Sequence, residues 1–176
     1  AWQTVSSKYL FRRPWLTVRC EDMLLPNGNH IPEYYILEYP DWVNMIAITK
    51  EGKFVFVRQY RPGIGRTCYE LCAGVCEKED VSPLVSAQRE LWEETGYGNG
   101  NWQEYMVVSA NPSTHTNLTH CFLATDVELI DHQHLEATED ISVHLFTLEE
   151  VRTLLENNEI MQSLNAAPLW KYMASL

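Results

Sequence analysis

The order of secondary-structure elements expected along this chain predicts an α/β fold, in which a mixed sheet is covered by helices on both faces. Short runs of β-branched and aromatic residues, bounded by Gly, Pro, Asn and Asp, occur along most of the sequence and favour strands. Two segments with helix-capping residues at their starts, after Ser82 and after Thr147, interrupt these runs. With 176 residues and 45% hydrophobic content, the chain suits one globular domain with a small appendage.

Residues 1–40 are expected to form this appendage, a small N-terminal arm of short β-strands and turns. Its clearest strands are predicted over 16–20 and 33–39. The Asn27-Gly28 pair between them is typical of a tight turn. Pro40 marks a plausible boundary, so the main domain is expected over 41–176.

The main domain is expected to alternate strands with helices. A hairpin is predicted about Glu51-Gly52, from strands over 42–49 and 54–60 that are rich in β-branched and aromatic residues. The last helical segment is expected from about residue 159, with an interruption near Pro168, which lacks a backbone N–H. The remaining elements are strands over 103–108, 119–127 and 141–146, a helix over 83–95 and a helix over 148–157.

The helix over 83–95 carries three carboxylates within five residues, Glu90, Glu93 and Glu94. At roughly 100° per residue they fall within one arc, beside an apolar arc. Like charges at this spacing destabilise a helix by about 0.2–0.5 kcal/mol per pair, and anions in the last turn cost about 0.3–1 kcal/mol each. A bound Mg²⁺ or Mn²⁺ ion offsets this cost, because hard cations prefer carboxylate oxygens. A solvated acidic helix end is the alternative.

The segment from Gly74 to Tyr97 resembles the Nudix box of the Nudix hydrolases. Its second half, Arg89-Glu90-Leu91-Trp92-Glu93-Glu94-Thr95-Gly96-Tyr97, matches the box at every fixed position. The first half differs, because the family places a Glu six residues after the glycine and eight before the arginine. Here Asp80 lies six residues after Gly74 but nine before Arg89. The candidates for this acid are Glu77, Glu79 and Asp80.

The resemblance implies the Nudix fold, an α/β/α sandwich with a mixed β-sheet and, here, the small N-terminal arm. It also indicates the ADP-ribose pyrophosphatase branch of the family. In that branch an arm similar to residues 1–40 pairs with the partner subunit, so a homodimer and contacts to the adenine side of the substrate are implied. The further matching segments are Tyr39-Pro40-Asp41-Trp42-Val43-Asn44, Val57-Arg58-Gln59-Tyr60-Arg61-Pro62, Asn111-Pro112-Ser113 and Glu139-Asp140-Ile141.

By the same resemblance, the acidic helix holds the metal. Glu90 and Glu94 are expected as the principal ligands, with Glu93 sharing one ion and the backbone carbonyl of Ala73 adding a ligand. The implied cofactor is Mg²⁺, with Mn²⁺ as the alternative. Arg89 is expected to orient the carboxylates by ion pairing, and direct contact with the substrate is the other role open to it.

The general base of this branch sits on a loop after the box, which corresponds here to residues 134–140. Glu139 matches one family acid, whereas Ala137 falls where another often lies, so Glu136 is the substitute if the loop bends differently. Glu139, Glu136 and Glu93 are therefore the candidate catalytic residues. A solvated acidic loop is the alternative interpretation of Glu136 and Glu139.

The substrate side is expected to use the few arginines near the box. Arg61 matches a family arginine that contacts the diphosphate or ribose, and Arg58 is a second candidate that alternatively serves as a surface charge. Glu70 lies close enough in sequence to assist. Trp15 and Trp42 are the aromatic residues chosen for stacking on adenine, against packing in the core or a dimer interface.

Composition narrows the class of protein. The net charge of −11 argues against nucleic-acid binding. The sequence contains no run of about 18 apolar residues, so no transmembrane helix is predicted. The five cysteines form no Cys-x-x-Cys pair, which favours free thiols, a reducing compartment and a cytoplasmic protein. His132 and His134 stand one residue apart in a polar loop, where exposure is expected rather than a metal site.

The leading hypothesis is a Mg²⁺-dependent Nudix hydrolase that cleaves the nucleotide ADP-ribose to AMP and ribose 5-phosphate. One rival is a hydrolase of another nucleoside diphosphate sugar, such as GDP-mannose. The other is a non-catalytic Nudix-type ligand sensor, in which the box carboxylates are expected to be lost. Because Glu90, Glu93 and Glu94 are all present, the sequence favours an enzyme.

Overall fold

The computed structural model describes residues 1–176, which divide into two compact units. The smaller, N-terminal unit comprises Ala1–Pro40 and Ser109–Leu118, and the larger comprises Asp41–Val108 and Thr119–Leu176. The smaller unit thus includes a segment from the middle of the chain, which the predicted arm of 1–40 lacked. None of the helices is both long and apolar enough to cross a membrane.

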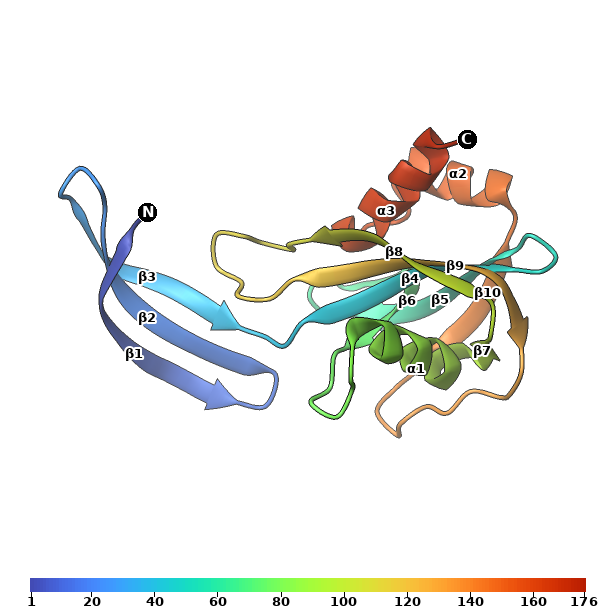
Figure 1. Cartoon of the computed structure of the whole chain (residues 1–176), viewed down its shortest axis with the longest axis horizontal. Coiled ribbons are helices and arrows are strands. Elements are labelled where there is room, and N and C mark those ends of the chain that lie inside the picture. The colour runs from blue at the N-terminus through green and yellow to red at the C-terminus, as the bar shows by residue number, and fades with distance from the viewer. The chain divides into compact units, whose positions relative to one another are not determined.

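The N-terminal unit is built on a three-stranded antiparallel sheet, in the order β1-β2-β3 (Figure 1). Its strands are β1 (Gln3–Arg13), β2 (Leu16–Leu24) and β3 (His30–Glu38). The predicted turn is confirmed, with Gly28 at φ 86°. The sequence did not reveal β1, because every one of its residues is exposed and no alternation of buried and exposed positions marks it. The segment 109–118 joins this sheet, since Leu37 exchanges backbone hydrogen bonds with Thr114 and Thr116.

The larger unit confirms the predicted α/β class. Its seven-stranded sheet runs β10-β5-β6-β4-β9-β7, with β8 paired to β9. The sheet is mixed, because β4 and β9 are parallel and the other pairs are antiparallel. The strands are β4 (Trp42–Thr49), β5 (Phe54–Arg61), β6 (Arg66–Val75), β7 (Tyr97–Gly98), β8 (Asn101–Val108), β9 (Thr119–Leu129) and β10 (Ser142–Phe146).

The predicted hairpin of β4 with β5 is wrong over most of its length. The two strands meet only at Ile48 and Phe54, and β6 lies between them beyond that point. The tight hairpin is instead β5–β6, which closes with Arg61 opposite Arg66. The sequence hid β6 because Glu70, a charged residue, occupies one of its buried positions.

Helices cover both faces of the sheet, as predicted (Figure 1). On one face α1 (Pro83–Thr95) packs Ala87 and Leu91 against Val43 and Met45 of β4. On the other face α2 (Leu148–Glu156) and α3 (Ser163–Ala174) pack against a second cluster. Successive side chains of a strand point to opposite faces, so β4 supplies odd-numbered residues to one core and Ile46 to the other. The second cluster contains Ile46, Phe56, Leu71, Val151 and Leu169.

Helix α3 starts at Ser163 and continues through Pro168, so the predicted interruption is wrong. A proline in a helix leaves the carbonyl four residues earlier without its donor. Here that carbonyl belongs to Leu164, and it accepts a hydrogen bond of 2.8 Å from the buried side-chain amide of Asn44 on β4. The sheet therefore supplies the hydrogen bond that Pro168 cannot.

We expect Asn44→Ala to lower the free energy of unfolding by about 1–3 kcal/mol, the cost of a buried polar group left unpaired. In a Pro168→Ala background residue 168 regains an N–H, so Asn44→Ala is expected to cost less. Urea unfolding of the two single variants and the double variant measures this coupling. Equal losses in both backgrounds contradict the compensation.

Candidate active site

Helix α1 has the ends that the sequence predicts. The Ser82 side chain accepts a hydrogen bond of 3.3 Å from the backbone N–H of Val85, and Pro83 takes the first helical position. Gly96 ends the helix in the left-handed conformation, φ 77°, with its N–H bonded to the Trp92 carbonyl. These caps set the helix length and thereby the positions of the carboxylates in its last turns.

Two of the three carboxylates on α1 are buried rather than solvated. The exposed fraction of Glu90 is 9% and that of Glu94 is 6%, whereas Glu93 is intermediate. A Cβ built on Gly74 of β6 overlaps the Glu90 carboxyl group, so the glycine provides the space in which that group lies. The acidic side of α1 is therefore pressed against β6.

Burial makes the charged forms of these acids unfavourable. It raises the pKa of Glu90 to about 7, and the nearby charge of Glu93 adds to the shift. It raises the pKa of Glu94 to about 8, and the charges of Glu90 and Glu139 add to that shift. The Oε2 atom of Glu94 is buried and has no hydrogen-bond partner.

These residues fit a hard divalent cation. Buried carboxylates with raised pKa values and an unpartnered oxygen are groups that an oxygen-binding cation stabilises in charged form. Ala73 of β6 adjoins them, since its backbone N–H hydrogen-bonds to Glu94. The structure thus brings together Ala73, Glu90 and Glu94, three of the four residues predicted to hold metal, with Glu93 linked to them through Arg89.

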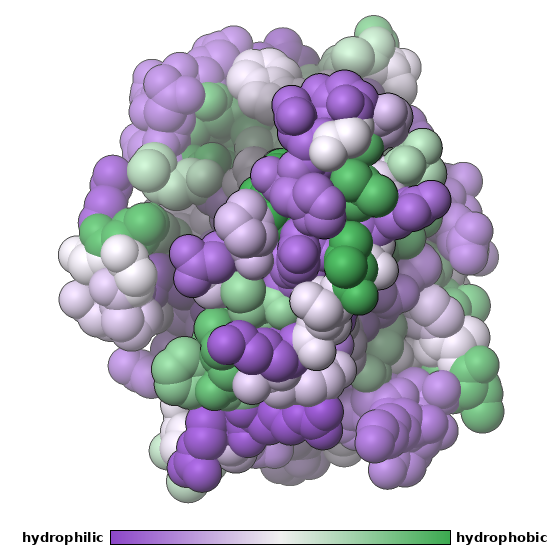
Figure 2. All heavy atoms as spheres, turned by 90° about the vertical axis from the view of Figure 1, so that its left-hand side faces the viewer, coloured by the Kyte–Doolittle hydropathy of each residue, from purple (hydrophilic) through white to green (hydrophobic).

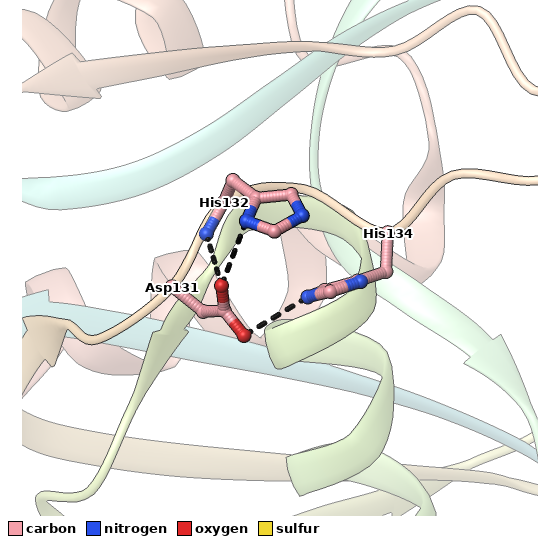
Figure 3. A group of neighbouring side chains, drawn as sticks. All are labelled: Asp131, His132 and His134. Atoms are coloured by element: carbon pink, nitrogen blue, oxygen red, sulfur yellow. Dashed lines mark hydrogen bonds and ion pairs between the residues drawn. The ribbon is translucent and has the colours of Figure 1, made fainter.

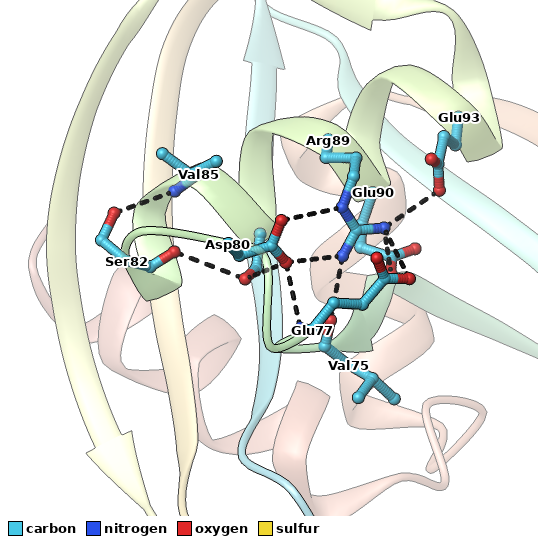
Figure 4. A network of polar contacts seen from close by, with 9 residues as sticks. Val75, Glu77, Asp80, Ser82, Val85, Arg89, Glu90 and Glu93 are labelled. Carbon is cyan, nitrogen blue, oxygen red and sulfur yellow. Dashed lines mark hydrogen bonds and ion pairs between the residues drawn. The ribbon is translucent and has the colours of Figure 1, made fainter.

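Arg89 lies at the centre of a polar network beside the carboxylates (Figure 4). Its Nη1 donates to Glu90 Oε1 at 3.1 Å and to Glu93 Oε2 at 3.2 Å. Its Nη2 donates to the carbonyl of Val75 at 3.0 Å and to Asp80 Oδ2 at 2.9 Å. The guanidinium is therefore held in a fixed orientation from the strand, the loop and the helix.

Asp80 is the loop acid that pairs with this arginine. Arg89 lowers the pKa of Asp80 to about 2, and a hydrogen bond of 2.7 Å from the Ser86 hydroxyl helps. Of the other two candidates, Glu77 lies 3.7 Å from Arg89 and is more exposed, and Glu79 is exposed. The longer loop thus brings Asp80 into hydrogen bonds with Arg89 and Glu77 into a longer ion pair with it.

Arg61 and Glu70 form a second pair near the site. Arg61 Nη2 donates to Glu70 Oε2 at 2.6 Å and Nε donates to Oε1 at 2.9 Å, a bidentate arrangement. This hydrogen bonding raises the pKa of Arg61, and the charge of Glu94 adds to the shift. Glu70 is buried, while the Arg61 side chain is 46% exposed. The buried carboxylate therefore orients the arginine, which remains accessible to solvent.

The structure does not bring all the predicted substrate residues to this place. Arg58 is exposed and lies over the Tyr69 ring, and Tyr69 packs with the α2–α3 side of the sheet, opposite α1. Trp42 begins β4 in the larger unit, whereas Trp15 belongs to the N-terminal unit, where it is 86% exposed. The roles of Trp15 and Trp42 stay predictions.

The loop between β9 and β10 is fastened to the end of α1. Gln133 Nε2 donates to the carbonyl of Glu94 at 2.8 Å, and the backbone N–H of His134 donates to the carbonyl of Glu93 at 2.7 Å. The His134 ring stacks on Trp92 at 4.0 Å between centroids. These contacts were not predicted from the sequence, where the only signal for them is that the last carbonyls of a helix lack partners within the helix.

The same loop presents Glu136 and Glu139, both exposed. They are linked to each other, since the N–H of Glu136 donates to Glu139 Oε2 at 2.8 Å and the N–H of Glu139 donates to the carbonyl of Glu136 at 3.0 Å. Glu139 is close enough for its charge to raise the pKa of Glu94. Of the two, Glu139 is the one whose charge acts on the buried acids.

Comparisons with known proteins identify the family to which the chain is similar. Residues 2–37 match the model of the nucleoside diphosphate sugar hydrolase N-terminal domain, and residues 39–166 match the NUDIX domain. An ADP-ribose pyrophosphatase of Bacillus subtilis (strain 168) is 31% identical over 93% of this chain and 88% of its own length. A methanol dehydrogenase activator of Bacillus methanolicus is 29% identical over 92% of this chain and 86% of its own length.

A solved structure shows the same fold at greater sequence distance. It is the crystal structure of an ADP compounds hydrolase, with a TM-score of 0.86 and 20% identity, and the match covers 99% of this chain and 94% of that one. The family matches span the whole described site, from Arg61 on β5 to the loop after β9. The chain therefore belongs to the Nudix hydrolases, as a Nudix-type nucleoside diphosphate sugar hydrolase related to the ADP-ribose pyrophosphatases.

Proposed function

We propose that this enzyme hydrolyses the diphosphate of ADP-ribose, with Mg²⁺, to give AMP and ribose 5-phosphate. The observation that carries the proposal is the buried Glu90–Glu94 pair with its unpartnered oxygen, set beside Arg61. The similarity to an ADP-ribose pyrophosphatase over 93% of the chain supports this substrate. Mn²⁺ is expected to replace Mg²⁺, because both are hard cations with oxygen ligands.

The proposed ligands of Mg²⁺ are Glu90, Glu94, Glu93 and the carbonyl of Ala73. When bound there, the ion supplies a Lewis acid for the phosphate oxygens and lowers the pKa of a coordinated water. Arg89 keeps Glu90 and Glu93 in place through its hydrogen bonds to both.

Arg61 is proposed to bind the substrate diphosphate. Its guanidinium is already oriented by Glu70, so less side-chain entropy is lost on binding. Glu139 is proposed to accept the proton of the attacking water, because it is exposed and acts on Glu94. Glu136, whose N–H holds the Glu139 carboxylate, then positions this base.

The test is product analysis with a panel of ADP-ribose, GDP-mannose and other nucleoside diphosphate sugars in the presence of Mg²⁺. ADP-ribose is expected to give the highest kcat/KM, with AMP and ribose 5-phosphate as the products. A higher kcat/KM for GDP-mannose overturns the proposed substrate but leaves the assignment as a nucleoside diphosphate sugar hydrolase in place. Binding of these compounds without any cleavage supports the ligand-sensor alternative instead.

We further propose that the enzyme is a homodimer formed through its N-terminal unit. Strand β1 leaves large apolar side chains exposed, including Val5 at 56% and Phe11 at 55%. Hydrophobic side chains also lie among hydrophilic ones on the face drawn in Figure 2. Sedimentation analysis is expected to give twice the chain mass of 20.4 kDa, and a monomer at all concentrations contradicts this assembly.

The cysteines are free, as suits the cytoplasmic location that we also propose.

A further inference from the structure

We propose that Asp131, His132 and His134 form a second metal site, for a divalent transition-metal ion such as Zn²⁺, separate from the carboxylates of α1. The site belongs to the loop between β9 and β10 and uses no residue assigned to the hydrolytic reaction. One potential ligand atom from each residue lies within 4.8 Å of the other two. The inference goes beyond the proposed function and does not depend on it.

The three side chains already face one another (Figure 3). His132 Nδ1 lies 2.8 Å from Asp131 Oδ1, and His134 Nε2 lies 3.0 Å from Asp131 Oδ2. The two imidazole rings are 4.4 Å apart between centroids. Two ring nitrogens therefore converge on one carboxylate, and the 79% exposed His132 ring is free to adjust to ligand distances of about 2.0–2.2 Å.

The donor set decides which metal the site takes. Imidazole nitrogen suits Zn²⁺, Ni²⁺ and Cu²⁺, whereas Mg²⁺ prefers carboxylate and water oxygens. Two neutral imidazoles and one carboxylate leave room for water in the coordination shell, as in other sites with three protein ligands. The hydrolytic carboxylates and this cluster thus differ in the class of metal that they select.

The backbone of the cluster is held in place before any metal binds. The N–H groups of Ile130 and Asp131 both donate to the carbonyl of Gly96, at 2.9 and 3.1 Å, and His134 donates to Glu93. The His134 ring stacks on Trp92 with an interplanar angle of 22°. Two of the three ligands are therefore fixed against the end of α1, which reduces the entropy lost on binding.

The position of the cluster gives it a link to the reaction. His134 is two residues before Glu136 and five before Glu139 in the same loop. An ion on Asp131 and the two imidazoles cross-links the first half of this loop, whose His134 ring stacks on Trp92 of α1. Metal binding at the cluster is therefore expected to affect the conformation of the loop that carries the proposed base.

Zn²⁺ titration by calorimetry tests the site, with untagged full-length protein saturated with Mg²⁺ so that the hydrolytic carboxylates are occupied. One Zn²⁺ per chain is expected. His132→Ala and Asp131→Asn are each expected to weaken it by at least about tenfold, because loss of a supporting residue alone costs about 10–100-fold. His30→Ala is the matched control, since His30 forms a similar pair with Asp22, at 2.9 Å, in the N-terminal unit.

A second readout follows from the stacked indole. Ni²⁺ bound at His134 is expected to quench the fluorescence of Trp92, and Trp92→Phe is expected to remove that part of the quenching. His132 is exposed, so His132→Ala is not expected to unfold the protein. Equal Zn²⁺ affinity in wild type and His132→Ala, or no Zn²⁺ binding to the Mg²⁺-saturated protein, overturns the proposal.

Discussion

Replacing Gly74 by Ala is expected to lower kcat about 100-fold or more while the protein remains folded. The added Cβ overlaps the Glu90 carboxyl group, so that group has to leave its position over β6. A displacement of about 1 Å in a catalytic constellation costs about 10²-fold in rate. The fold survives because the displaced atoms are the end of one side chain and Gly74 has no positive φ.

Gly63→Ala is the matched control, because a Cβ there meets nothing within 4 Å and the residue also has no positive φ. The comparison requires kcat and KM with Mg²⁺ together with a thermal unfolding curve for each variant. Wild-type kcat in Gly74→Ala means that Glu90 is not needed where the structure places it. A variant that unfolds at much lower temperature means that the strand, not the carboxylate, is what Gly74 protects.

Replacing Glu94 by Gln is expected to abolish hydrolysis and, without metal, to stabilise the protein at alkaline pH. Loss of a principal ligand removes the charge stabilisation supplied by the ion, worth several kcal/mol, so kcat is expected to fall by about 10³-fold or more. The stability effect has a different origin, namely the burial that raises the pKa of Glu94 to about 8.

The sign of the stability effect follows from proton binding. Between the ordinary pKa of 4.5 and the raised value of about 8, the folded state keeps a proton that the unfolded state has lost. Stability therefore falls as the pH rises through this window, by an amount on the order of a few kcal/mol, since one pKa unit corresponds to about 1.4 kcal/mol. A glutamine side chain does not ionise, so the Glu94→Gln variant avoids that loss.

Urea unfolding with a chelator, on either side of this pH window, measures the difference. The free energy of unfolding of Glu94→Gln is expected to exceed that of wild type only at the alkaline end of the window. Added Mg²⁺ is expected to stabilise wild type much more than the variant. Glu104→Gln is the control, because Glu104 is exposed on β8. A stability difference between Glu94→Gln and wild type that does not change with pH shows that the carboxyl group is not buried as described.

The carboxylates of α1 serve the reaction at the expense of folding. Gly74 leaves the space for the Glu90 carboxyl group and Glu94 carries a second one, and burial makes the charged form of both unfavourable without a cation. Natural active sites commonly keep such destabilising groups, and their removal stabilises the fold at the expense of activity. The same interpretation accounts for the three glutamates on α1 that an isolated helix would disfavour.

Much of the fold could be predicted from local sequence. Caps such as Ser82, Gly96 and Thr147 act within one turn of a helix, so they mark helix ends without knowledge of the rest of the chain. Strand β4, rich in apolar residues, was predicted at its observed bounds, Trp42–Thr49, and β5, β9 and β10 were predicted to within two residues at each end. Strands β1 and β6 were missed, because one is exposed throughout and the other buries a charged residue.

The family motif, the carboxylates on α1 and the α/β class could be inferred from the chain alone, because they depend on residue types at fixed spacing. The folded chain was needed to show that β6 separates β4 from β5, that Asn44 supports the helix through Pro168 and that Asp80 is the loop acid that hydrogen-bonds to Arg89. The folded chain also shows that Arg58 lies on the other side of the sheet from α1. These facts depend on contacts between residues far apart in sequence, and no local pattern records which distant groups will meet.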